Sequence, residues 1–123
     1  MKKIVVLGST GSIGVNALKV IENNPTKLEL FAISGNNNVE LLLKQACKFN
    51  CKFVVCGEAH YKSLRAKLPS HIKLLIGIDG MIEISTQKEV DTVLCSVVGT
   101  AGLQPLINAI KAKRMSSQND CHP

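Results

Sequence analysis

The chain has 123 residues, of which 46% are apolar, so it is predicted to form one globular domain and is not a disordered chain. Its net charge of +6 comes from basic residues spread along the chain, and only 3% of the residues are aromatic. Nucleic-acid binding usually needs clustered basic residues and stacking aromatics, so we expect a solvated basic surface and no nucleic-acid partner.

The cysteines and the apolar runs indicate the compartment. Five cysteines, an odd number, argue against a closed disulfide framework and favour a reducing, cytoplasmic environment. Cys56 and Cys95 lie in apolar β-type runs and are predicted to be small core residues. Cys47, Cys51 and His60 lack the paired spacing of a zinc site, so we predict no metal site. The first apolar run is too short for a signal peptide, and no run is long enough for a membrane span.

The predicted elements alternate between strand and helix along the chain. A continuous apolar run at 4–7 is typical of a strand buried on both faces. From Ser12 the apolar residues take helical spacing, and Pro25 follows the end of that helix. Asn38 is a predicted N-cap. The later predicted strands are 28–34, 52–56, 72–76 and 92–98, and the later predicted helices are 39–49, 59–68, 79–84 and 103–112.

This alternation predicts an α/β fold of the Rossmann-like, doubly wound type. We expect a mainly parallel sheet of about five strands flanked by helices. In such sheets the loops that follow the strands share one edge, and ligands bind there near the topological switch point. The first helix is predicted to pack through Ile13, Ala17, Leu18 and Ile21, with Asn16, Lys19 and Glu22 facing solvent.

The loop after the first strand reads G-x-x-G-x-x-G and leads directly into a helix. Gly8 allows a tight turn, Gly11 allows the backbone to approach a pyrophosphate, and Gly14 allows close packing of the helix. The phosphates would lie on N–H groups at the helix N-terminus, with the hydroxyls of Thr10 and Ser12 as further donors. The alternative is a tight turn that binds nothing. A nucleotide-triphosphate P-loop fits poorly because no Gly-Lys-Ser/Thr closes the loop.

The end of the second strand bears on the choice of nucleotide. An NAD site usually carries Asp or Glu there, to bind the ribose 2′-hydroxyl. Here the chain has Gly35, Asn36, Asn37 and Asn38, without a carboxylate. This leaves room for a 2′-phosphate and favours NADP, although no Arg or Lys stands inside the loop. The alternative is that the asparagines provide only turn and cap chemistry, and both roles can coexist.

Two segments together resemble one enzyme family. Residues 7–14, LGSTGSIG, are similar to the opening of 1-deoxy-D-xylulose 5-phosphate reductoisomerase. Residues 96–103, SVVGTAGL, resemble that family's I-V-G-x-A-G-L segment. The first motif occurs in other dehydrogenases, whereas the pair at this separation is far more specific. The resemblance runs from Met1 to about Lys113.

The resemblance implies an enzyme that converts 1-deoxy-D-xylulose 5-phosphate to 2-C-methyl-D-erythritol 4-phosphate in non-mevalonate isoprenoid synthesis. It implies NADPH as hydride donor, a divalent metal (Mg, Mn or Co) as Lewis acid in the full-length enzyme, and a homodimer. By the same resemblance, Thr10, Gly11, Ser12 and Ile13 would hold the pyrophosphate. The loop at 36–38 would lie at the 2′-phosphate, where Asn38 matches the family and Asn36 and Asn37 depart from it.

The resemblance also implies what this chain lacks. We expect an NADP-binding domain at 1–112, an irregular or non-native tail at 113–123, and no catalytic domain, because the family's metal carboxylates and substrate site come later in its sequence. The chain alone would then be inactive, with no catalytic residue of its own. Two alternatives remain: another dehydrogenase, such as a semialdehyde-dehydrogenase-like Rossmann domain, or a non-catalytic nucleotide-binding fragment.

Overall fold

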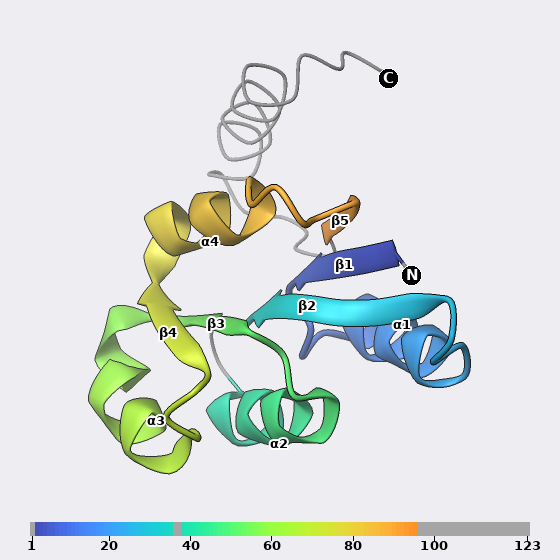
Figure 1. The fold of residues 1–123 in the computed structure, drawn as a ribbon. Coiled ribbons are helices and arrows are strands. Elements are labelled where there is room, and N and C mark those ends of the chain that lie inside the picture. Colours follow the sequence, from blue (N-terminus) through green and yellow to red (C-terminus); the bar gives the residue numbers. More distant parts are fainter. Residues whose placement is uncertain (1, 36–37, 96–123) are drawn as a thin grey trace.

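A computed structural model describes residues 2–35 and 38–95 and shows one parallel sheet with helices on both faces (Figure 1). The strand order is β4-β3-β2-β1-β5, and every neighbouring pair is parallel. The predicted α/β, doubly wound fold is therefore confirmed. The elements are β1 (Lys2–Leu7), α1 (Ser12–Glu22), β2 (Leu28–Ser34), α2 (Val39–Phe49), β3 (Phe53–Cys56), the 3-10 helix η1 (Glu58–His60), α3 (Tyr61–Lys67), β4 (Lys73–Ile76), α4 (Gly77–Ser85) and β5 (Thr92–Cys95).

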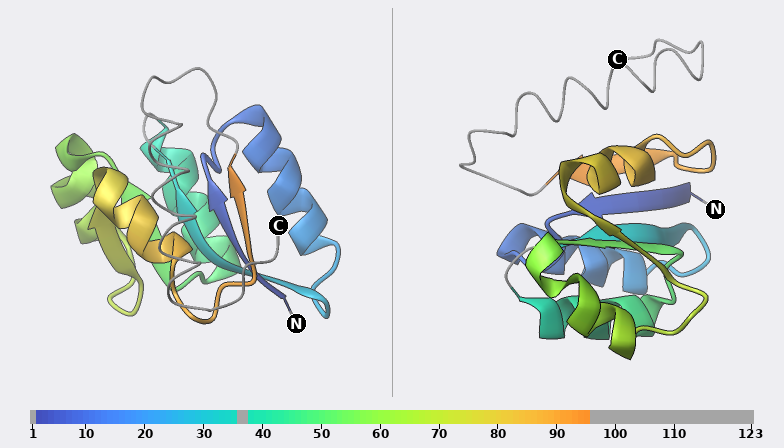
Figure 2. Two further views of the ribbon diagram at one scale, coloured as in Figure 1. Left: turned by 90° about the horizontal axis from the view of Figure 1, so that it is seen from above. Right: turned by 90° about the vertical axis from the view of Figure 1, so that its left-hand side faces the viewer.

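The first strand divides the molecule into two cores. Ile4 and Val6 pack with α1, α2 and α3 on one face, whereas Val5 and Leu7 pack with Ile84 of α4 on the other. Successive side chains of a strand point to opposite faces, so a strand between two helical layers must be apolar throughout. Figure 2 (right) shows α4 on one side of the sheet and α2 and α3 on the other. The predicted doubly buried strand is confirmed.

The chain order places the topological switch at β1. From β1 the chain moves through β2 and β3 to β4 at one edge, and α4 then leads back to β5 on the far side of β1. β1 thus lies between β2 and β5, and the chain crosses the sheet toward opposite edges on its two sides. The turn after β1 lies where these crossings diverge. This is where doubly wound sheets bind their ligands.

Several predicted boundaries are wrong by a few residues, for local reasons. β1 begins at Lys2, because the pairing of Lys2 with Leu28 of β2 uses backbone groups and needs no apolar side chain. The helix predicted at 59–68 splits into η1 and α3, and it stops before Leu68, which is extended because Pro69 follows. The predicted short helix at 79–84 is longer and spans Gly77–Ser85.

The other outcomes concern single side chains. Ile13 was predicted on the packing face of α1, but it is 60% exposed, because the first turn of α1 extends past the sheet. Cys56 is buried as predicted. The predictions for 96–98, 103–112 and 113–123, and for the side chain of Cys95, lie outside the described residues.

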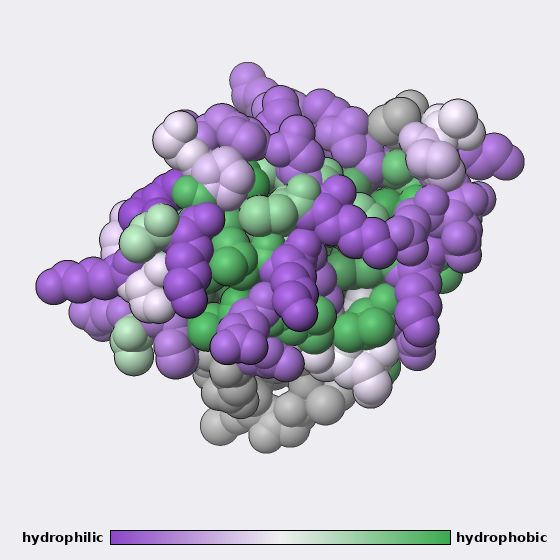
Figure 3. Space-filling model, turned by 90° about the horizontal axis from the view of Figure 1, so that it is seen from below, coloured by the Kyte–Doolittle hydropathy of each residue, from purple (hydrophilic) through white to green (hydrophobic). Residues whose placement is uncertain are grey.

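The side of the molecule that carries α1, α2 and α3 has a surface of mixed polarity. Figure 3 shows hydrophilic side chains projecting from this side of the molecule, with apolar side chains between them. Within residues 2–35 and 38–95, no helix is both long and apolar enough to cross a membrane.

Candidate cofactor site

The glycine turn leaves β1 in a conformation that an L side chain rarely adopts. Gly8 has φ +83°, and its N–H donates to the backbone oxygen and to Oγ of Ser34, each at 3.0 Å. The N–H of Ser9 donates to the same backbone oxygen at 2.9 Å. The turn is therefore fastened to the carboxyl end of β2, and the role predicted for Gly8 is the one that the structure shows.

Gly14 allows the first turn of α1 to pack directly on the glycine turn. A Cβ atom at Gly14 would lie 2.7 Å from Cα of Ser9 and closer still to the backbone oxygen of Gly8. Both neighbours are backbone atoms, which cannot rotate away. The sequence attributed close helix packing to this glycine, and the structure provides that close approach.

Gly11 differs, because nothing in the described protein requires it to be glycine. Its φ of −78° and ψ of 170° suit any residue, and a Cβ atom there would meet only the backbone oxygen of Gly8, at an ordinary 3.6 Å. Gly11 is exposed and stands at the N-cap of α1. A side chain at Gly11 would therefore project into the space in front of the helix, where a ligand would lie.

The first turn of α1 is suited to an anion. Its N–H groups have no intrahelical acceptors, and the helix dipole concentrates positive potential there. No acidic residue lies in this turn, and Ser12 and Ile13 are exposed. Backbone N–H groups in this arrangement can bind phosphate oxygens without a basic side chain.

The second predicted loop lies against the glycine turn. A Cβ atom at Gly35 would lie 3.3 Å from Cγ2 of Thr10, so the two loops are in contact. Asn38 caps α2 as predicted, because its Oδ1 accepts the N–H of Leu41 at 3.2 Å. Asn36 and Asn37 lie outside the described residues. The other predicted cofactor residues gather at the carboxyl edge of the sheet: Gly8, Thr10, Gly11, Ser12, Ile13, Gly14 and Asn38.

Two supporting residues were not predicted from the sequence. Ser34, at the end of β2, accepts both N–H groups that open the glycine turn. Gln45 of α2 is buried and makes two hydrogen bonds with Ser9. The available signal was that Gln45 is the polar member of the buried side of α2, beside Leu42 and Ala46.

The described cysteine side chains are free thiols in ordinary structural environments. Cys47 is exposed, whereas Cys51 is buried and its thiol points to the backbone oxygen of Ala46 at 3.8 Å. Burial raises the pKa of Cys51 to about 12, a backbone hydrogen bond opposes this, and Cys47 adds a small rise. Cys51 is thus a neutral thiol. Among residues 2–35 and 38–95, no three His, Cys, Asp or Glu side chains group as metal ligands.

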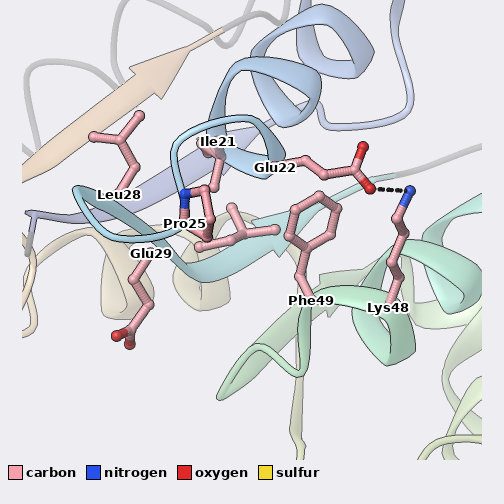
Figure 4. Close-up of a pocket in the computed structure, with 8 residues that line it drawn as sticks. Ile21, Glu22, Pro25, Leu28, Glu29, Lys48 and Phe49 are labelled. Carbon is pink, nitrogen blue, oxygen red and sulfur yellow. Dashed lines mark ion pairs between the residues drawn. The ribbon is translucent and has the colours of Figure 1, made fainter.

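A pocket of about 300 Å³ lies at the opposite edge of the sheet (Figure 4). It lies between the C-terminal ends of α1 and α2 and the start of β2, and Glu22 and Lys48 form an ion pair of 2.6 Å beside it. Phosphate binding depends on the N–H groups of a turn rather than on a deep cavity, so this pocket does not compete with the glycine turn as the cofactor site. Its lining residues are Ile21, Glu22, Pro25, Leu28, Glu29, Leu30, Lys48 and Phe49.

Comparisons with known proteins agree with this geometry. The family model for 1-deoxy-D-xylulose 5-phosphate reductoisomerase matches residues 4–116. Curated relatives of that name from Bacteroides thetaiotaomicron and Phocaeicola vulgatus are 49% and 47% identical. The matches cover 92% and 90% of this chain but only 30% of each relative, so the chain spans about a third of their length.

Solved structures give the same result. A crystal structure of DOX-P reductoisomerase in complex with NADPH, fosmidomycin and magnesium superposes with a TM-score of 0.82 and 31% identity, over 92% of this chain and 28% of that chain. The enzyme from Zymomonas mobilis in complex with NADPH gives 0.80 and 31%, over 91% and 30%. On the sequence, the fold and the glycine turn together, this chain belongs to the 1-deoxy-D-xylulose 5-phosphate reductoisomerase family.

Proposed function

We propose that this chain is the NADPH-binding part of a 1-deoxy-D-xylulose 5-phosphate reductoisomerase. The observation that carries the proposal is the glycine turn, where Gly11 opens onto the N-terminus of α1. The solved relatives whose titles name NADPH support the choice of ligand. NADPH, when bound, supplies the hydride for the family's reduction.

Residues of the glycine turn have different roles in the proposed cofactor site. The backbone N–H groups and hydroxyls of Thr10 and Ser12 bind the pyrophosphate, with Gly11 and Ile13 leaving access to the first turn of α1. Gly8 and Gly14 give the turn its shape. Asn38, which caps α2, is proposed to lie at the adenosine 2′-phosphate together with Asn36 and Asn37, which lie outside the described residues.

The rest of the reaction belongs to groups outside the described residues. We assign 1–112 to an NADP-binding Rossmann-like domain and 113–123 to an irregular or non-native tail. The substrate 1-deoxy-D-xylulose 5-phosphate, the divalent metal and a homodimer partner are proposed for the full-length family enzyme. On this proposal the chain binds NADPH without turning over substrate. The free cysteines at Cys47, Cys51 and Cys56 favour a cytoplasmic location.

Titration of the chain with NADPH and NADH, followed by thermal unfolding, tests the proposal. At about 100 times its dissociation constant, a ligand that binds only the folded chain stabilises it by about 2.7 kcal/mol. We expect NADPH to stabilise the chain more than NADH. Lack of stabilisation by either nucleotide would contradict the proposal, and equal stabilisation by both would contradict only the NADP preference.

Gly11→Ala separates binding from folding. The new methyl group meets only ordinary contacts within the protein, so the free energy of unfolding of the unliganded chain should fall by less than about 1 kcal/mol. The same group stands where the pyrophosphate would lie, so NADPH affinity should fall at least about tenfold. Unchanged affinity in this variant would place the cofactor elsewhere.

A further inference from the structure

Ser9 connects the glycine turn to a helix that lies far from it in the sequence. Its Oγ donates to Oε1 of Gln45 at 2.7 Å, and Nε2 of Gln45 donates to the backbone oxygen of Ser9 at 2.9 Å. Ser9 is 0% exposed and Gln45 is 7% exposed. With the N–H of Ser9 bonded to Ser34, every polar atom of Ser9 is held by a group outside the turn.

The amide of Gln45 satisfies two buried polar atoms of Ser9, so it contributes to the fold as well as to the geometry of the turn. Gln45 lies on the buried side of α2 with Leu42 and Ala46, both fully buried. An apolar side chain there would leave Oγ and the backbone oxygen of Ser9 buried without these partners, which would destabilise the fold. The same buried pair also fixes one geometry of the turn, because any other geometry leaves a donor or acceptor unsatisfied.

The geometry that the pair fixes is that of the peptide leading into the proposed pyrophosphate site. Thr10, Gly11 and Ser12 follow Ser9 directly, and the direction of their N–H groups depends on how the Ser9 peptide is held. A turn held in its binding conformation before the ligand arrives avoids the entropy cost of ordering on binding. α2 also packs against the second loop, because a Cβ atom at Gly35 would lie only 3.1 Å from Cδ1 of Leu42.

We propose that Gln45 is a positioning residue for the pyrophosphate turn: through its two hydrogen bonds to Ser9, it holds the N–H groups of residues 10–12 in the direction that the cofactor needs. This role rests on the proposed function, because it presumes a dinucleotide on the turn. NADPH and NADH carry the same pyrophosphate. Loss of the positioning therefore weakens both by the same factor and leaves their ratio unchanged.

The test is a double-mutant cycle on the full 123-residue chain, with the dissociation constants of NADPH and NADH as readouts. Gln45→Met keeps the length of the side chain and removes both hydrogen bonds, and Ser9→Ala removes one. We expect Gln45→Met to raise both dissociation constants by roughly tenfold, Ser9→Ala to raise them by less, and the double variant to match Gln45→Met. If Gln45→Met does not fold, a rise of about threefold for both nucleotides in Ser9→Ala provides the test.

Ile72→Val is the matched control for stability. Ile72 is fully buried just before β4, at the edge of the sheet opposite the turn, so this variant should lower the melting temperature and leave both dissociation constants unchanged. Positioning by Gln45 is overturned if Gln45→Met lowers only the melting temperature, if it weakens NADPH alone, or if the two substitutions are additive. Failure of the unsubstituted chain to bind NADPH would instead refute the proposed function, and Gln45 would lose its role with it.

Discussion

The two ends of α1 meet their neighbours in opposite ways. At the carboxyl edge of the sheet, α1 packs on the glycine turn through Gly14, and buried hydrogen bonds between Ser9 and Gln45 tie that turn to α2. At the amino edge, α1 and α2 are joined by the Glu22–Lys48 ion pair, whose side chains are 45% and 60% exposed, beside an open pocket. The same two helices are thus fixed at one end and loosely connected at the other.

The two edges differ in the chemical groups that they offer to a ligand. The pocket at the amino edge has a volume of about 300 Å³, and the Glu22 and Lys48 side chains that line it already pair with each other. The carboxyl edge offers the backbone donors of the first turn of α1. Because a phosphate needs directed donors more than enclosure, the proposed cofactor site lies at the more firmly held end of α1.

Gly14→Ala should give the largest effect, at the fixed end. The new Cβ would overlap backbone atoms of Gly8 and Ser9, so either α1 or the turn must shift. Overpacking of this kind costs about 3 kcal/mol, which exceeds the roughly 1 kcal/mol that alanine gains over glycine within a helix. Chemical denaturation followed by circular dichroism measures the loss. A variant as stable as the parent would show that the turn can move and would remove the contrast between the two ends.

The pH dependence of Cys51 should give an intermediate effect, near the loose end. Burial raises the pKa of Cys51 in the folded state to about 12, above the ordinary thiol value of 9.0. Stability from the neutral thiol is therefore fully present below pH 9 and is lost as the pH rises toward 12, by about 2 kcal/mol at about pH 10.5. Unfolding of the parent and of Cys51→Ala, compared at neutral and alkaline pH, isolates this loss. If the free energy of unfolding depends on pH in the same way in both proteins, this expectation is refuted. If the parent loses more stability at alkaline pH, a buried polar group near the amino edge has a larger energetic effect than an exposed one at the same edge.

Glu22→Gln should give the smallest effect. Exposed ion pairs contribute little, because water screens the charges and the long side chains lose entropy, so the loss should be below about 0.5 kcal/mol. Melting temperatures in low and high salt measure it, and the difference between parent and variant should vanish in high salt. A loss above about 1 kcal/mol that persists in salt would mean that the amino edge is held as firmly as the carboxyl edge.

Local patterns in the sequence were sufficient for most of the fold. The apolar run of β1, the helical spacing after Ser12 and the cap at Asn38 each depend on residues a few positions apart, and the structure has these elements where they were expected. The glycines at Gly8 and Gly14 were interpretable for the same reason, because a positive φ and a close approach within one turn are local requirements. Boundaries were less exact where backbone pairing or a following proline decided them, as at Lys2 and Leu68.

By itself, then, the sequence determined the α/β class, the position of the glycine turn and the family. Tertiary structure decided what holds that turn. Gln45 and Ser9 are 36 positions apart, and Ser34 and Gly8 are 26 apart, so no periodicity relates them. Only the packing of α2 beside α1, and of β2 beside β1, brings these groups within hydrogen-bonding distance. The same packing leaves Ile13 exposed, although its spacing placed it on the apolar face, because the sheet ends before the first turn of α1 does.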